Sequence, residues 1–274
     1  MKKILSLIVS LAVVIGLFSG CGAKKDDKTI KVGASSTPHA EILESVKEDL
    51  AAKGYTLEVV IYDDYVLPNK ALADGTLDAN YFQHIPYLEN FNEEQGTHLV
   101  NAGGIHYEPF GIYPGTKASL DDIADGDTIA VPNDTTNEAR ALLLLQDAGL
   151  IKLPEGTTLE STCTPLDVVE NTKNLELVEL NAELITGARS DVAYAVINGN
   201  YATLENLVPN ADGLYVEGAD SLAAQSYVNV VAVKPENAEA DWVKALEQVI
   251  YTQKVYDLIV ASGFAPTFTP ADAQ

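Results

Sequence analysis

Only two arginines occur in the 274 residues, and one of them stands where it could bind an anion. Arg140 follows the apolar segment 128–132 and lies in the first turns of an expected helix. A helix start offers unpaired backbone N–H groups and a positive dipole end, and a guanidinium adds a planar bidentate donor. Together these groups suit a carboxylate. A structural ion pair between Arg140 and Asp134 or Glu138 explains the residue equally well.

Asparagines stand at the ends of the expected strands. Asn137 follows the strand 128–132, Asn198 follows the strand 192–197, and Asn229 lies within the β run 227–233. Each amide offers an acceptor and two donors without net charge, which suits both ends of a zwitterion. Helix caps and turns are the alternative role for any one of them. Asn229 differs because asparagine is disfavoured between two valines of a strand, so it requires another reason.

A third group of candidates consists of rings near expected strand ends. Its members are Tyr65, Phe82, His84, Tyr87, His106 and Tyr107. Aromatic faces would hold an apolar or thioether side chain, at about 0.3–1.5 kcal/mol for each sulfur–aromatic contact. Ordinary core packing is the alternative for Phe82 and Tyr87.

A metal site is the rival interpretation for part of this group together with one acid. The residues concerned are His39, His84, His106 and Glu108. They lack the i,i+4 or short-loop spacing of many metal sites, so we expect neither metal nor cofactor. The sequence also has no GxSxG elbow, Walker loop, HExxH motif or isolated pair of catalytic carboxylates. We therefore expect a binding protein and not an enzyme.

The composition excludes several other classes of protein. There are 17 Lys+Arg against 40 Asp+Glu, giving a net charge of −23, so a basic surface for nucleic acid is missing. Two cysteines cannot form a disulfide scaffold or a cysteine-rich zinc module. A hydrophobic content of 47% is too high for a disordered chain. An acidic globular protein of one or two domains remains.

The N-terminus is typical of an exported lipoprotein. Lys2 and Lys3 precede a short apolar run, and small residues precede Cys21. We interpret residues 1–20 as a signal peptide, Cys21 as the lipid attachment site and 21–28 as a tether. A plain secretion signal or an uncleaved anchor is the alternative.

The remaining chain alternates expected strands and helices, which indicates an α/β fold with mostly parallel strands. The expected strands are 29–34, 56–62, 77–82, 128–132, 174–180, 192–197 and 227–233, and the expected helices lie over 42–50, 65–74, 88–96, 136–148 and 240–262. Two α/β units predict two lobes, 29–113 with 229–274 and 114–228, around one shared cleft. A single continuous α/β domain is the alternative.

Several long motifs, in this order, resemble the methionine-binding lipoprotein family. They are KVGAS…PHAEILE (31–44), DYVLPNKALADGTLDANYFQHIPYLENFN (64–92), IHYEPFGIY (105–113), IAVPNDTTNEARALLLLQDAGLIKL (129–153) and DVAYAVINGNYA (191–202). The resemblance covers nearly the whole chain after the signal peptide. It implies a periplasmic-binding-protein fold of two lobes, each a mixed sheet flanked by helices, which captures methionine for the permease and ATPase subunits of an ABC importer.

The resemblance also implies roles for single residues. Arg140 would bind the ligand carboxylate, Asn198 and Asn229 would hold the ammonium and carboxylate, and Asn137 would line that end. Tyr65, Phe82, His84, Tyr87 and His106 would enclose the side chain. The chain departs from the common family pattern at Thr135, Ala139 and Tyr107. Another small apolar amino acid or a methionine-containing dipeptide therefore remains an alternative ligand.

Overall fold

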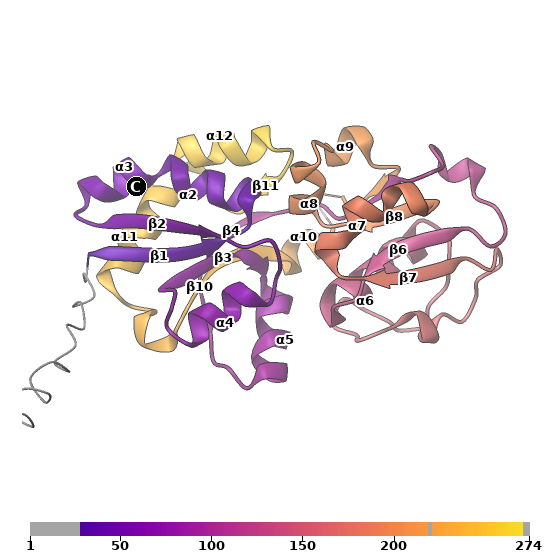
Figure 1. Cartoon of the computed structure of the whole chain (residues 1–274), viewed down its shortest axis with the longest axis horizontal. Coiled ribbons are helices and arrows are strands. Elements are labelled where there is room, and N and C mark those ends of the chain that lie inside the picture. Colours follow the sequence, from indigo (N-terminus) through magenta and orange to yellow (C-terminus); the bar gives the residue numbers. More distant parts are fainter. Residues whose placement is uncertain (1–27, 219–220, 271–274) are drawn as a thin grey trace, which may run out of the picture.

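Two lobes, each built on its own mixed β-sheet, lie side by side in the computed structural model (Figure 1). The structure describes residues 28–218 and 221–270. The predicted signal peptide, the lipid attachment site Cys21 and the tether up to residue 27 lie outside the described residues. In the described part of the chain, no helix has the length and apolar character needed to cross a membrane.

The first lobe contains a six-stranded sheet with the order β11-β4-β10-β3-β1-β2. Its strands are β1 (Thr29–Ala34), β2 (Thr56–Ile61), β3 (Ala79–His84), β4 (Val100–Tyr107), β10 (Val228–Val233) and β11 (Ala265–Pro266). The helices are α2 (Glu41–Ser45), α3 (Lys47–Ala52), α4 (Leu67–Ala73), α5 (Ile85–Gln95), α11 (Asp241–Ile250) and α12 (Gln253–Ala261), with the short helical segments η1 (Ser36–Ala40) and η5 (Pro235–Asn237).

Helices cover both faces of this sheet, which explains why its central strands are apolar on both sides (Figure 1). In β10, Val231 and Val233 pack into the core beside α2, α3, α11 and α12. Their neighbours Val230 and Ala232 point the other way, toward α4 and α5. This alternation follows from the two-residue period of a strand.

The second lobe contains a five-stranded sheet with the order β7-β6-β8-β5-β9. Its strands are β5 (Gly111–Pro114), β6 (Thr128–Pro132), β7 (Glu176–Leu180), β8 (Tyr194–Ile197) and β9 (Tyr215–Val216). The helices are α6 (Thr135–Asp147), α7 (Ala182–Ala188), α8 (Gly199–Leu204), α9 (Pro209–Asp212) and α10 (Leu222–Ser226), with the short segments η2 (Leu120–Asp122), η3 (Pro165–Asp167) and η4 (Arg189–Asp191). Here too, α6 and α7 bury opposite faces of the sheet.

The two mixed sheets flanked by helices confirm the predicted fold class, but one expectation about strand direction and two about single helices were wrong. Four of the nine strand pairs among the described residues are parallel, so the sheets are not mostly parallel. The expected helix 240–262 is two helices, because the backbone leaves the helical conformation at Tyr251 and Thr252. The expected helix 42–50 is likewise interrupted at Val46.

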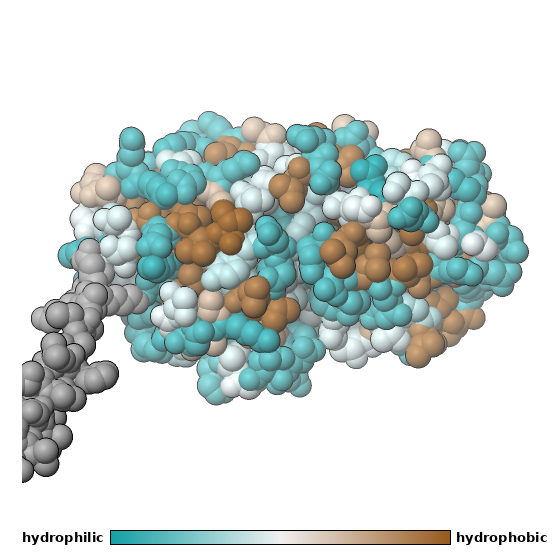
Figure 2. All heavy atoms as spheres, in the orientation of Figure 1, coloured by the Kyte–Doolittle hydropathy of each residue, from teal (hydrophilic) through white to brown (hydrophobic). Residues whose placement is uncertain are grey.

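The predicted division of the chain into lobes, at 113/114 and 228/229, stays a prediction. By strand pairing alone, β5 belongs to the second sheet and β10 to the first. The chain therefore changes sheets between Tyr107 and Gly111, and again between Val216 and Val228. Hydrophilic residues cover much of both lobes on the face shown in Figure 2, and the apolar residues there form separate patches.

Candidate ligand-binding site

Strand ends from both sheets meet at one cavity between the lobes, with a volume of about 330 Å³ that includes space open to solvent. β3 contributes Phe82 and His84, the start of α6 contributes Asn137 and Arg140, and Asn198 follows β8. The residues that line the cavity are Tyr65, Phe82, Gln83, His84, Tyr87, Glu108, Asn137, Arg140, Asn198, Gly199, Asn200 and Asn229. Eight of the nine predicted ligand-binding residues are in this set; His106 is not.

The register of the first sheet explains the position of Asn229. On β10, Asn229 is paired with His84 of β3 on one side and with His106 of β4 on the other. Its Oδ1 lies 3.0 Å from Nε2 of His39, which is on η1. Asn229, a polar residue within an apolar strand, is therefore surrounded by three histidines at the edge of the cavity. Its hydrogen bond compensates for the cost of burying the amide.

Arg140 is buried and held on several sides. Its Nε and Nη2 donate to the two carboxylate oxygens of Glu217, at 2.8 and 2.5 Å, and Nη2 also donates to the backbone oxygen of Glu108. The rings of Phe110 and Tyr227 lie 4.8 and 4.3 Å from its guanidinium carbon. The alternative pairing with Asp134 or Glu138 is therefore wrong, since the partner is Glu217 on the segment after β9. Nη1 makes no hydrogen bond to any of the described residues.

Three aromatic residues of the cavity wall form a box. The Tyr65 ring lies 5.8 Å from Phe82 and 5.7 Å from Tyr87, between centroids, and Phe82 lies 6.1 Å from Tyr87. These separations are typical of edge and tilted aromatic pairs. Such a box offers ring faces and edges to an apolar or sulfur-containing side chain.

Amide groups connect the two lobes beside the cavity. Oδ1 of Asn137 accepts from Nδ2 of Asn198 at 2.8 Å and lies 3.1 Å from Nε2 of His84. Asn137 in turn donates to Asp134, the residue that caps α6. Oδ1 of Asn198 is buried and has no hydrogen-bond partner in the described part of the chain. This orphaned acceptor marks a place for a donor from a ligand.

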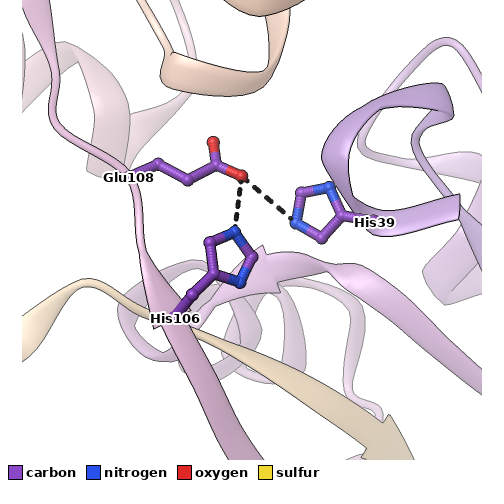
Figure 3. Close-up of side chains that lie close together, drawn as sticks. All are labelled: His39, His106 and Glu108. Carbon is purple, nitrogen blue, oxygen red and sulfur yellow. Dashed lines mark hydrogen bonds and ion pairs between the residues drawn. The ribbon is translucent and has the colours of Figure 1, made fainter. Parts of the chain in front are cut away.

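Two imidazoles and one carboxylate form a compact cluster next to the cavity (Figure 3). Oε1 of Glu108 lies 2.9 Å from Nε2 of His106 and 3.4 Å from Nε2 of His39. The Tyr81 hydroxyl lies 2.6 Å from Nδ1 of His106. Burial lowers the pKa of His39 to about 4 and that of His106 to about 3, so both rings are neutral at pH 7.

The cluster contains three of the four residues that the sequence offered as alternative metal ligands. One ligand atom from each of His39, His106 and Glu108 lies within 4.8 Å of the others. His84 is not part of this cluster. Its Nε2 lies 3.1 Å from Oδ1 of Asn137, and its Nδ1 accepts a hydrogen bond from the backbone N–H of Tyr87. Neutral imidazoles and a carboxylate are suitable ligands for a divalent ion. The hydrogen bonds between His106 and Glu108 and between His39 and Asn229 hold these groups close together without one.

Comparisons with known proteins identify the family of this chain. The family model for the NlpA lipoprotein matches residues 30–271. The chain belongs to the NlpA lipoprotein family. The "Methionine-binding lipoprotein MetQ" of Bacillus subtilis is 42% identical over 269 residues, covering 94% of this chain and 95% of the relative. The "D-methionine-binding lipoprotein MetQ" of Escherichia coli is 43% identical over 258 residues, covering 92% of this chain and 90% of the relative.

Solved structures of similar proteins share the two-lobed fold of this NlpA-family chain. A putative lipoprotein from Ruminococcus gnavus has a TM-score of 0.84 at 54% identity, covering 87% of this chain and 99% of that one. A nutrient-binding protein from Burkholderia cenocepacia, solved with methionine bound, has a TM-score of 0.82 at 39% identity. That match covers 87% of this chain and 100% of the Burkholderia chain.

The positions at which this NlpA-family chain departs from the common pattern lie outside the cavity wall. Tyr107 is buried, and its hydroxyl donates to Glu217 at 2.5 Å. Thr135 donates to Glu94 at the surface between α6 and α5, and Ala139 packs in the core of the second lobe. Tyr107 therefore contacts the partner of Arg140 and does not line the cavity.

Sequence reasoning missed Glu217 and gave Glu108 a role only in the metal alternative. Gln83, Gly199 and Asn200 also line the cavity without having been predicted. Glu108 had an available signal, because it directly follows His106 and Tyr107, which were already candidates. Glu217 had none, since its segment has no regular pattern and Arg140 is 77 residues away in the sequence.

Proposed function

We propose that this protein binds free methionine between its lobes and delivers it to the permease and ATPase subunits of an ABC importer. The observation that carries the proposal is one cavity whose wall contains both a buried guanidinium and an aromatic box. An amino acid with a long apolar side chain has the matching polarity. The names of the relatives and the methionine-bound neighbour support the same ligand.

In the proposed complex, Nη1 of Arg140 binds the carboxylate, while Nε and Nη2 stay with Glu217. Asn198 and Asn229 complete the hydrogen bonds of the zwitterion, and Asn137 holds Asn198. Tyr65, Phe82, His84 and Tyr87 surround the thioether, and His106 acts from behind the wall through its contact with Glu108. Complete pairing is required because a buried charge without a partner costs several kcal/mol.

Ligand binding would favour the closed arrangement of the lobes, since the polar groups that hold the zwitterion come from both of them. The closed form would then dock on the permease and release methionine chemically unchanged. A diacyl lipid on Cys21 would keep the protein on the extracytoplasmic face of the membrane, because one acyl chain alone gives only marginal binding.

Isothermal titration calorimetry with methionine tests this function. We expect one site on the intact protein, and a conservative Arg140→Lys substitution should weaken binding at least about tenfold because the fixed planar donor is lost. Arg189→Lys is the matched control, because Arg189 donates to the backbone oxygen of Pro114 away from the cavity. Absence of heat and of any thermal shift at saturating methionine would contradict the proposal. If another apolar amino acid or a methionine dipeptide binds instead, that molecule and not methionine is the ligand.

A further inference from the structure

The strand β3 is irregular where it borders the cavity. Phe82, Gln83 and His84 all line the cavity, although successive side chains of a regular strand point to opposite faces. Tyr81 and Gln83 are paired with two successive residues of β10, so Phe82 is an extra residue in β3. β3 therefore has a β-bulge at Phe82, and bulges beside functional sites re-aim side chains.

The bulge brings two buried amides together. Residues three apart in a regular strand point to opposite faces, but the extra residue places Gln83 on the same face as Asn80. Val230 and Ala232, the residues opposite them on β10, pack on this face beside α4 and α5. Here Nε2 of Gln83 donates to Oδ1 of Asn80 at 2.8 Å. This hydrogen bond spans the bulge and depends on it.

A third amide, from α4, completes the network. Nδ2 of Asn69 donates to Oε1 of Gln83 at 2.7 Å, and Oδ1 of Asn69 accepts from Gln83 at 2.7 Å and from Asn80 at 2.8 Å. Asn80 also donates to the backbone oxygen of Pro68 at 3.2 Å. All three side chains are buried, and none of their polar atoms lacks a partner in the described part of the chain. We call Asn69, Asn80 and Gln83 the amide network.

The burial of three amides needs a reason other than stability. Leu72, Leu77 and Leu88 belong to the core on the same face, and apolar side chains fill a core without the cost of burying polar groups. A fully satisfied polar network instead specifies one arrangement of the chain. The arrangement specified here is the bulge of β3 together with the start of α4.

Two rings of the aromatic box are attached to the segments that the amide network joins. Phe82 is the extra residue of the bulge, directly before Gln83. Tyr65 lies two residues before α4, whose first turn contains Asn69. The centroids of the two rings are 5.8 Å apart. A change in the bulge would therefore move Phe82 relative to Tyr65.

We infer that the amide network stabilises the bulge of β3 and thereby holds Phe82 in the aromatic box, so that it sets the preference of the cavity for a thioether side chain. The inference rests on the proposed function and assigns a role to Asn69 and Asn80, which do not line the cavity. Both are positioning residues. The polar atoms of Gln83 are occupied within the network, so the network acts on the ligand through Phe82.

The test measures the affinity ratio of methionine to norleucine by competition calorimetry. Asn80→Leu removes the hydrogen bond across the bulge, and we expect it to lower the ratio by about 1.7- to 12-fold, the size of one sulfur–aromatic contact. Combined with Phe82→Leu, it should lower the ratio no further than Phe82→Leu alone, because both changes act on the same contact. An unchanged ratio in Asn80→Leu, or a full additional loss in the double variant, would overturn the inference.

A second variant and a control exclude a general loss of stability as the cause. Asn69→Ala opens the network from α4 without altering β3, and it should also lower the ratio. Asn92→Ala is the matched control, because the Asn92 amide joins α5 to Leu99 by hydrogen bonds and does not line the cavity. It should leave the ratio unchanged. An equal decrease in Asn92→Ala would overturn the inference, because the ratio would then follow stability alone.

A ligand-free crystal structure of Asn80→Leu or Asn69→Ala separates this inference from the proposed function. We expect the pairing of Gln83 with Val230 to be lost or the Phe82 ring to be displaced. An intact bulge with Phe82 in place would overturn the inference, whether or not the wild type binds methionine. A disturbed bulge in a protein whose wild type does not bind methionine would contradict the proposed function and leave the role of the network in the bulge supported.

Discussion

Arg140 of α6 and Glu217 after β9 meet through two parallel hydrogen bonds, although 77 residues separate them in the sequence. Both side chains are buried, with 4% and 8% of their surfaces exposed. Tyr107 and the backbone N–H of Phe110 also donate to Glu217. The guanidinium therefore stands in one orientation before any ligand arrives, and this preorganisation lowers the entropic cost of binding a carboxylate.

Removing one partner of this pair should destabilise the fold strongly. We expect Glu217→Ala to lower the free energy of unfolding by about 3–5 kcal/mol, because it leaves the charge of Arg140 buried without a counter-ion. Urea denaturation measures the change. Glu44→Ala is the control, since Glu44 pairs with Lys47 in a largely exposed pair and should cost less than about 1 kcal/mol.

A double variant separates the two possible causes of that loss. If the unpaired charge causes it, Arg140→Met combined with Glu217→Leu should recover most of the stability, since apolar residues can replace a buried ion pair at little cost. If the double variant is as unstable as Glu217→Ala, the lost stability comes from packing and the pair is not the cause.

The aromatic box should set the preference for a thioether over a plain hydrocarbon. Phe82 lies within the box formed with Tyr65 and Tyr87. We expect Phe82→Leu to reduce the affinity ratio of methionine to norleucine by about 1.7- to 12-fold, the size of one sulfur–aromatic contact of about 0.3–1.5 kcal/mol. Competition calorimetry with both ligands gives the ratio. Phe268→Leu should leave the ratio unchanged, because Phe268 packs with Tyr251 and Tyr256 and does not line the cavity.

The sequence predicted those parts of the site that depend on local pattern. Asn137 and Arg140 could be placed because a strand followed directly by a helix start brings polar residues to the sheet edge. The pairing of Asn229 with His84 and His106 could not be predicted, because it depends on the register between strands that are distant in the sequence. Likewise, β4 escaped prediction because Gly103 and Gly104 interrupt its apolar pattern.

Buried histidines should make the folded state sensitive to acid. Burial, and then the charge of Arg140, lowers the pKa of His84 to about 3 from its ordinary 6.5. Below about pH 6.5 the unfolded chain takes up a proton that the folded chain refuses, so this residue lowers the free energy of unfolding progressively as the pH falls toward 3. The contribution is absent above pH 7, where His84 is neutral in both states.

His84→Asn should reduce this acid sensitivity. The side chain of His84 caps α5 by accepting from the backbone N–H of Tyr87, and asparagine can keep that bond. We expect the wild type to lose stability relative to His84→Asn between pH 6.5 and 4, measured by urea denaturation at several pH values. His98→Asn, at an exposed position of the first lobe, is the control. Parallel pH profiles for the wild type and His84→Asn would show that the imidazole is not held neutral.

Closure of the lobes should depend on hydrogen bonds that the ligand does not touch. The Tyr201 hydroxyl, on α8 of the second lobe, donates at 2.8 Å to the backbone oxygen of Asp63 in the first lobe. Tyr201 does not line the cavity, in contrast to Tyr65, which donates to Asn200 across the same gap. Removal of the Tyr201 hydroxyl therefore weakens the closed form without altering the wall around the ligand.

We expect Tyr201→Phe to weaken methionine binding by about 2- to 12-fold, corresponding to one neutral hydrogen bond of about 0.5–1.5 kcal/mol, and mainly through faster dissociation. Stopped-flow fluorescence measures the rates, and small-angle X-ray scattering should show that methionine compacts the wild type more than the variant. Tyr194→Phe is the control, because the Tyr194 hydroxyl donates to Ser119 within one lobe. If Tyr201→Phe instead slows association and leaves dissociation unchanged, the bond forms before the ligand binds, and the two lobes would be held together independently of methionine.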